Sequence, residues 1–206
     1  MISKRIASIK DFMNPMAPGW HQQQVETVKM MPTPMAMQPT AYIRNSRAGM
    51  PHGETGQIEV SSVHDGETLA VNLSWEGVSP KGGDFPDAIA VAFPLKGNPV
   101  LIMMGSKTDP IHILHWKAGK GVKSIVAQGI GLSEKGPEFR IASEAVEDGN
   151  RWRVVISRIL GTGGGIAPVT PGVDTKIGFA LWSGANDERA GLKAFSIDWI
   201  PFAVEA

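Results

Sequence analysis

Short alternations of apolar and polar residues run through most of this chain, and clusters of turn residues separate them. A period of two is typical of β-strands that bury one face. The pattern predicts about ten strands. Their ranges are Gln57–His64, Thr68–Trp75, Asp87–Leu95, Pro99–Gly105, Pro110–Ala118, Val122–Gly129, Pro137–Val146, Arg151–Leu160, Thr175–Gly184 and Leu192–Val204.

The connections between these runs are short and rich in Gly, Asn and Asp, residues that tolerate positive φ. Three of them are Asp65–Glu67, Lys96–Asn98 and Glu147–Asn150. With 24 glycines and 15 prolines, the sequence leaves little room for long helices. It therefore predicts an all-β fold, an antiparallel β-sandwich with few short helices.

The N-terminal part has a different composition. Methionine and proline are combined in Met13–Trp20 and again in Met30–Thr40. Such segments suit an extended arm or an edge strand better than a helix. We expect residues 1–48 to form an extended segment that either lies over the sandwich or contacts a partner subunit. Residues 49–206 are expected to form the sandwich domain.

Charge and composition narrow the classes of partner and cofactor. Lys and Arg number 20, as do Asp and Glu, so no net field recruits nucleic acid or anionic lipid. We expect no membrane span, because no apolar run reaches the roughly 18 residues that one needs. The N-terminus lacks the apolar segment of a secretory signal. Cysteine is absent beside ten methionines, so a cofactor would be held non-covalently, through His, Met, Lys or a carboxylate.

Two histidines, His112 and His115, lie three positions apart in a predicted strand. On a helix, that spacing would place both imidazoles on one face and could hold a metal ion. On a strand, residues three apart point to opposite faces, so the pair cannot chelate one ion. We expect each to be structural, and the isolated His21, His52 and His64 carry no spacing signal.

No catalytic motif stands out. The glycine-rich run Gly161–Pro168 lacks the Lys-Ser/Thr of a phosphate-binding loop and is predicted to be a flexible loop. There is no Gly-x-Ser-x-Gly motif, and the acidic residues are scattered. Tryptophans near strand ends are expected to pack in the core or an interface, namely Trp75, Trp116, Trp152, Trp182 and Trp199.

Lys193 stands where the charged, glycine-containing segment Ser183–Gly191 enters an apolar strand. A lysine at such a margin usually extends its amine to water. If the amine is instead held inside, desolvation lowers its pKa, and the neutral amine can donate a lone pair to a metal. The residues alone leave both alternatives open.

Four segments carry a family resemblance: DAIAVAFP (87–94), NPVLIMMGSKTDPIHILHWKAG (98–119), RWRVVISRIL (151–160) and KIGFALWSGANDERAGLKAFSIDW (176–199). The specific elements are the Met-Gly after a predicted strand, the HWKA after a Pro-led strand and the terminal WSG…ER.G.K block. From about Gly56 onward, the chain resembles the gamma subunit of ethylbenzene dehydrogenase and its relatives. These are the haem b subunits of type II molybdenum enzymes of the DMSO reductase family, which include dimethyl sulfide, selenate and chlorate systems.

The resemblance implies a β-sandwich that holds one haem b between a methionine and a lysine. The methionine before glycine is Met104, and the lysine of the terminal block is Lys193. Met103 is the rival, but adjacent strand residues face opposite sides, and the Met-Gly adjacency selects Met104. Gly105 is expected to allow close approach of the macrocycle. Two protein ligands leave no open position, so such a haem carries electrons and binds no substrate.

The resemblance also implies partners and a compartment. The chain would be a non-catalytic electron-transfer subunit, joined to a molybdenum catalytic alpha subunit and an iron–sulfur beta subunit. The molybdenum cofactor and the clusters would lie in those partners, and a c-type cytochrome would accept the electrons. We expect a periplasmic location, reached with a partner that carries a twin-arginine signal, with a cytoplasmic complex as the alternative.

Two other interpretations remain open. A haem-free β-sandwich that binds carbohydrate or protein would be colourless and would expose a tryptophan platform on one sheet face. A purely structural gamma-like subunit would keep the fold and the partners without the haem.

Overall fold

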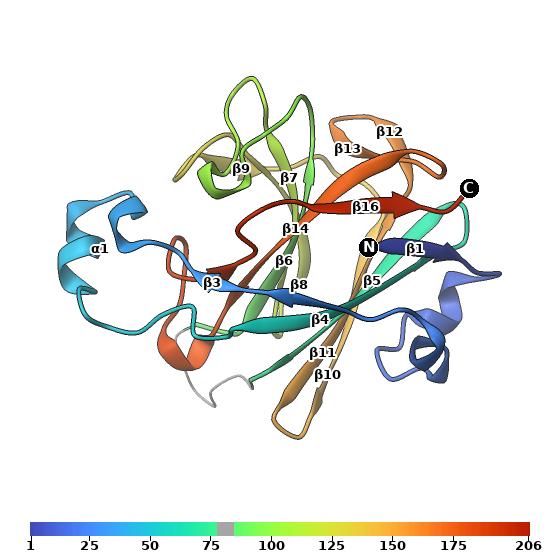
Figure 1. Cartoon of the computed structure of the whole chain (residues 1–206), viewed down its shortest axis with the longest axis horizontal. Helices are drawn as coiled ribbons and strands as arrows, with labels where there is room; N and C mark the ends of the chain where they lie inside the picture. Colours follow the sequence, from blue (N-terminus) through green and yellow to red (C-terminus); the bar gives the residue numbers. More distant parts are fainter. Residues whose placement is uncertain (78–84) are drawn as a thin grey trace.

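The computed structural model describes residues 1–77 and 85–206, which form an all-β sandwich (Figure 1). This confirms the fold class predicted from the sequence. Four long antiparallel strands make the body of the first layer, in the order β10 (Ile141–Asp148), β11 (Arg151–Ile159), β5 (Thr68–Glu76) and β4 (Gln57–His64). The second layer has the order β14 (Asp174–Trp182), β6 (Ala88–Pro94), β7 (Ile111–Lys117), β8 (Gly121–Ala127) and β9 (Ser133–Lys135).

Two short strands at the chain ends join the layers. β1 (Ile2–Arg5) pairs in parallel with β4 and with β16 (Ile200–Val204), and β16 pairs with β14. The two termini therefore lie side by side, near the centre and right of Figure 1. The parallel β1 is an exception to the antiparallel arrangement predicted from the sequence.

The core lies between the layers because the strands alternate. On β6, Ile89, Val91 and Phe93 are buried between the sheets, whereas the intervening residues are alanines that face outward. Three tryptophans meet at one end of this core, with Trp75 stacked on Trp152 and both in contact with Trp116. The predicted packing role of these three residues is confirmed.

Residues 1–48 are built into both layers. Besides β1, they contribute β2 (Glu26–Lys29), which pairs with β4, and β3 (Met31–Pro32), which pairs with β15 (Ala194–Phe195). Short helices complete the segment: η1 (Ile9–Phe12), η2 (Pro18–Gln22), η3 (Met35–Met37) and α1 (Ala41–Ser46). In Figure 1 the residues before β2 lie at the right of the molecule and α1 at the left. Within the described ranges, no helix has the length and apolar character needed to cross a membrane.

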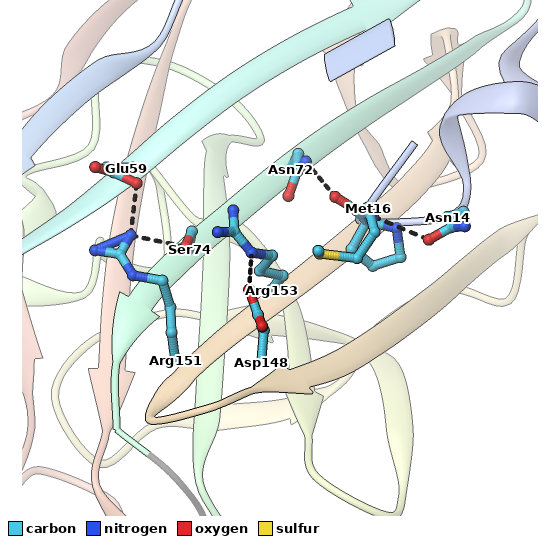
Figure 2. Close-up of polar contacts among 9 residues, drawn as sticks. Asn14, Met16, Glu59, Asn72, Ser74, Asp148, Arg151 and Arg153 are labelled. Atoms are coloured by element: carbon cyan, nitrogen blue, oxygen red, sulfur yellow. Dashed lines mark hydrogen bonds and ion pairs between the residues drawn. The ribbon is translucent and has the colours of Figure 1, made fainter. Parts of the chain in front are cut away.

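The first part of this segment covers the outer face of the first layer. Trp20 and Phe12 pack edge to face there, over Val63, Ala70 and Val155. Beyond this cover the face is polar, as Figure 2 shows. Its contacts include an ion pair of 2.6 Å between Arg151 and Glu59, another of 3.2 Å between Arg153 and Asp148, and a bond of 3.3 Å from the Asn72 side chain to the Pro15 carbonyl.

Three local predictions were wrong. The predicted strand Pro99–Gly105 is instead a single 3₁₀ turn, η4 (Leu101–Met103). The predicted strand Leu192–Val204 is interrupted between β15 and β16. The run Gly161–Pro168 forms most of a hairpin of β12 (Gly161–Gly163) and β13 (Ile166–Val169), because Gly164 and Gly165 adopt positive φ.

Candidate cofactor pocket

A cavity of about 450 Å³ lies on the outer face of the second layer. Its volume falls within the range of about 300–1,000 Å³ that is usual for sites binding small molecules and cofactors. The covering walls come from the N-terminal segment around Thr33–Pro39, from the loop that carries η4 and from the loop before β15. The surface is mostly hydrocarbon, and few polar side chains reach it.

Small residues form the floor of this pocket. Ala88, Ala90 and Ala92 point outward from β6, and Ala180 lies beside Ala90 on β14. On the other side of β6, the larger His115 of β7 pairs in register with Ala90. The result is a shallow trough along β6, since small side chains lie between larger ones. The alternation of DAIAVAFP thus fills the core on one face and leaves room on the other.

Met104 reaches this pocket from a tight turn. The amide N–H groups of Met104 and Gly105 donate to the carbonyls of Leu101 and Val100, at 2.9 and 3.2 Å, and close the turn. Met104 itself takes a left-handed conformation, with φ of 59°. Its side chain is half-buried and packs beside Ala92 and Ile111.

Met103 faces the other way and is 48% exposed. Strand alternation predicts opposite directions for the two methionines. The directions differ as expected, but the cause is the left-handed turn. The fold itself requires glycine at position 105, because a Cβ there would lie 2.7 Å from the Asp109 carbonyl oxygen. The glycine is needed for the turn irrespective of any bound group.

Lys193 is buried and does not extend to water; its exposed fraction is 7%. Its amine donates to Sδ of Met104 at 3.4 Å and lies 5.2 Å from the ring centroid of Trp182. Burial lowers the pKa of the Lys193 amine from 10.5 to about 8. A larger neutral fraction near neutral pH follows, and the neutral form is the one that donates a lone pair to a metal.

Thus the fold brings together the two residues singled out in the sequence, although 89 positions separate them. Neither belongs to a cluster of common metal ligands. In residues 1–77 and 85–206, no three His, Asp or Glu side chains gather in a way that could hold an ion. The two atoms that these residues bring together in the pocket are the thioether sulfur of Met104 and the amine nitrogen of Lys193.

The loop that carries Lys193 is fixed by the N-terminal segment. The backbone N–H of Thr33 donates to the Lys193 carbonyl at 3.0 Å, and the Gln38 amide donates to the Gly191 carbonyl at 2.9 Å. The buried Glu188 carboxylate accepts from the backbone N–H groups of Gly53 and Ser183, at 2.6 and 2.9 Å. These contacts give the Met/Pro-rich segment a role that its composition did not reveal: it is one wall of the pocket.

Strained backbone is concentrated in the two loops that carry Met104 and Lys193. Among described residues other than glycine, positive φ occurs at Met104, Asp187 and Ala190. Each such residue costs on the order of 1–3 kcal/mol, and residues of this kind persist mainly at functional sites. All three belong to the turn of η4 or to the loop that ends at Lys193.

The two histidines of β7 point to opposite faces, as predicted. His112 is fully buried in the interior, where Nδ1 accepts the Ala167 N–H at 3.1 Å and Nε2 lies 2.9 Å from the Ser124 hydroxyl. It is a structural histidine. His115 lines the pocket instead, 4.8 Å from the Trp182 ring, and in the described part of the chain its buried Nε2 has no hydrogen-bond partner.

Burial lowers the pKa of both imidazoles to about 4, so both rings are neutral near neutral pH. The spacing of the two histidines predicts a structural role for His115 and does not reveal its place in the pocket. The available signal was the alternation of β7, which directs His115 to the same side as the outward alanines of β6. Among the remaining histidines, His52 lies 2.7 Å from the Thr33 carbonyl, His64 is buried and His21 is exposed.

Tryptophan does not form an exposed platform on either layer. All six tryptophans lie in the described residues, and none is exposed: five are buried, and Trp199 is half-buried. Trp199 donates to the Pro99 carbonyl at 2.7 Å, next to the turn that holds Met104. The haem-free module with a tryptophan platform thus lacks the surface it requires.

The fold and the pocket together define a β-sandwich protein with an apolar pocket large enough for a cofactor-sized group. Comparison with known proteins gives relatives of a narrower kind. The chlorate reductase subunit gamma of Ideonella dechloratans is 33% identical over 152 residues, 70% of this chain and 64% of that protein. The dimethylsulfide dehydrogenase subunit gamma of Rhodovulum sulfidophilum is 29% identical over 157 residues, 69% and 58% of the two chains.

A third relative, from Haloferax mediterranei, is named "Putative respiratory nitrate reductase heme subunit ORF7" and is 29% identical over 187 residues, 85% of this chain and 64% of that protein. The family resemblance predicted from the sequence is confirmed by these relatives. The chain spans less than two thirds of the length of each. No protein-family model matches the chain.

Solved structures show the fold alone. A family 9 carbohydrate-binding module from Caldicellulosiruptor kristjanssonii, in complex with glucose, superposes with a TM-score of 0.57 over 100% of this chain and 95% of that chain. Its sequence identity to this chain is 8%. The sandwich architecture is therefore shared with proteins whose binding surfaces need not resemble this pocket.

Proposed function

We propose that this chain is a haem-carrying electron-transfer subunit of a molybdenum oxidoreductase complex, with one haem b held between Met104 and Lys193. The observation that carries the proposal is the pair itself. A thioether and a buried amine face each other at 3.4 Å inside an apolar cavity, on loops that are distant in sequence. Two relatives are gamma subunits of such enzymes, and a third is named as a heme subunit.

The residues present suit this group. The trough of small side chains along β6 offers an apolar site for a flat ring, and the two donors approach from loops on the pocket's walls. Two further cations lie at the pocket's edge on exposed positions, Lys117 and Arg189. Cations there suit the carboxylates that haem b carries on one edge. Met104 and Lys193 would hold the iron, and their mutual hydrogen bond would be given up when the group binds.

The chemistry supplied by the bound group would be one-electron transfer. Met104 is a soft ligand that favours the reduced iron, which raises the potential. Lys193 can act as a ligand only as the neutral amine, and the apolar pocket favours that form. With both sides taken by protein, the chain binds and orients the group and admits no substrate. Catalysis would reside in a partner.

The proposal extends to partners and location. We propose a molybdenum-containing alpha subunit and an iron–sulfur beta subunit as partners, and a c-type cytochrome as the acceptor. We also propose that the complex works in the periplasm and is exported with a partner that carries a twin-arginine signal. Purification of the tagged chain from fractionated cells tests both points; recovery of the chain alone from the cytoplasm would contradict them.

Haem content is the direct test of the function. The chain purified from its native host, or reconstituted with haemin, should give a b-type pyridine haemochrome at about one haem per chain and a six-coordinate low-spin spectrum. A colourless protein that takes up no haemin would overturn the proposal and leave the haem-free module or the purely structural subunit. The exposed His21→Leu variant is a control, since it lies outside the pocket and should bind haem like the wild type.

A further inference from the structure

The pocket contains a polar atom that the two proposed ligands leave unused. Nε2 of His115 is buried and has no hydrogen-bond partner among residues 1–77 and 85–206. Buried polar nitrogens are nearly always paired in native proteins, so a lone one calls for an explanation. His112, on the same strand, has both ring nitrogens engaged and shows what a satisfied histidine looks like here.

His115 lies at the Lys193 end of the pocket. The imidazole is 4.8 Å from the Trp182 ring, and the Lys193 amine is 5.2 Å from that same ring. Met104 packs against Ala92 and Ile111, and its Sδ accepts from the Lys193 amine at 3.4 Å. The Lys193 amine therefore contacts the thioether and also lies near the tryptophan that His115 touches.

The amine needs a new partner once a metal separates it from the sulfur. In the structure, Lys193 donates to Sδ of Met104, and that bond cannot coexist with an ion between the two atoms. A coordinated amine keeps two N–H groups that point away from the metal. The amine already lies near the Trp182 ring, which His115 contacts, so this wall offers an acceptor for those N–H groups.

We propose that His115 is a positioning residue for the Lys193 ligand, whose neutral imidazole accepts a hydrogen bond at Nε2 from the coordinated amine. The inference rests on the proposed haem site. Partners of this kind orient a metal ligand and raise its basicity. A more basic amine stabilises the ferric iron, so the His115 contact lowers the midpoint potential that the thioether raises.

Substitution of His115 in the haem-loaded chain tests this. His115→Phe keeps a ring against Trp182 but has no acceptor, and His115→Gln restores an acceptor on a flexible side chain. We expect His115→Phe to keep one low-spin haem per chain and to raise its midpoint potential. A tenfold loss of preference for the ferric state corresponds to about 59 mV for a one-electron couple. His115→Gln should return the potential toward the wild-type value, and the exposed His21→Leu should leave it unchanged.

The outcomes separate the two proposals. Absence of b-type haem from the wild type would remove the haem site itself. Haem present at full stoichiometry, with the same potential in wild type, His115→Phe and His115→Gln, would overturn the role of His115 and leave the haem site standing. His115→Leu provides a second variant without an acceptor, in case the phenylalanine ring obstructs loading of the pocket.

Discussion

The two outer faces of the sandwich are both covered by the first fifty residues of the chain, yet only one of them is filled. On the first layer, Trp20 packs directly over Ala70 in one apolar cluster with Val63 and Val155. On the second layer, the segment Thr33–Pro39 stands as a wall, and the space above Ala90 stays open. Both faces present an alanine beneath the covering segment, Ala70 on the first layer and Ala90 on the second. The bulk of the covering side chain decides whether the face becomes core or pocket.

The two faces also differ in where their charged side chains lie. The first layer carries its charges at the surface, where Arg151 meets Glu59 and water reaches both side chains (Figure 2). The second layer buries a lysine amine that has sulfur as its hydrogen-bond partner. A surface pair adds little to stability, whereas burying an amine away from water costs free energy. This buried amine makes the second face the one on which we propose the cofactor site.

Removing either proposed ligand should have the largest effect. Lys193→Leu and Met104→Leu each introduce an apolar side chain of similar size and remove a donor atom. We expect the low-spin spectrum to be lost in both, and haem affinity to fall at least tenfold. Absorption spectra and haemin titration of the apoprotein measure this. Trp20→Phe on the opposite face is the matched control, and a low-spin spectrum that survives in Lys193→Leu/Met104→Leu would refute both ligand assignments.

One alanine on each outer face allows the open pocket and the filled face to be compared by the same substitution. Ala90→Phe should occupy the open trough and block haem binding while the chain stays folded. Ala70→Phe should overpack the space beneath Trp20 and cost about 1–3 kcal/mol of stability. Circular dichroism, urea unfolding and haemin titration distinguish the two. Equal loss of haem binding in both variants, with equal loss of stability, would show that the faces do not differ in this way.

The strand pattern could be predicted from the sequence because each long strand carries its own alternation and turn residues. Gln57–His64 agrees with β4 at both ends for this reason. The strand predicted for Pro99–Gly105 was wrong because a short apolar run fits a buried strand and a 3₁₀ turn equally well. What decides between them is the left-handed Met104 and the contact of Gly105 with Asp109, and neither is visible locally.

The site was predicted only in part. Met104 and Lys193 came from a family resemblance, and the structure adds that they face each other. The place of His115 could not be predicted, because its spacing from His112 bears only on chelation and the pocket beside β7 is walled by loops distant in sequence. The role of Gln38 could not be predicted, since its bond to the Gly191 carbonyl joins residues that are 153 positions apart.

Stability of the apoprotein should depend on pH through Lys193. The unfolded chain keeps its amine protonated up to about pH 10.5, whereas the folded chain releases the proton near pH 8, since burial lowers the pKa to about 8. Between these values the unfolded state binds more protons, so the free energy of unfolding rises with pH, by roughly 3 kcal/mol in total. Urea unfolding from pH 7.5 to 10 measures the rise. In Lys193→Leu it should disappear, and an identical pH profile in wild type and variant would contradict the burial of the amine.

The smallest effect should come from the charged face of the first layer. Arg151 and Glu59 are 2.6 Å apart, but their side chains are 25% and 42% exposed. A double-mutant cycle with Arg151→Ala and Glu59→Ala should give a coupling of about 0–1 kcal/mol, because water screens the pair and the Ser74 hydroxyl can still bind the arginine. Haem content and midpoint potential should not change in either variant. A change in the potential would mean that charges on this face reach the pocket through the sandwich, and that the two faces are not independent.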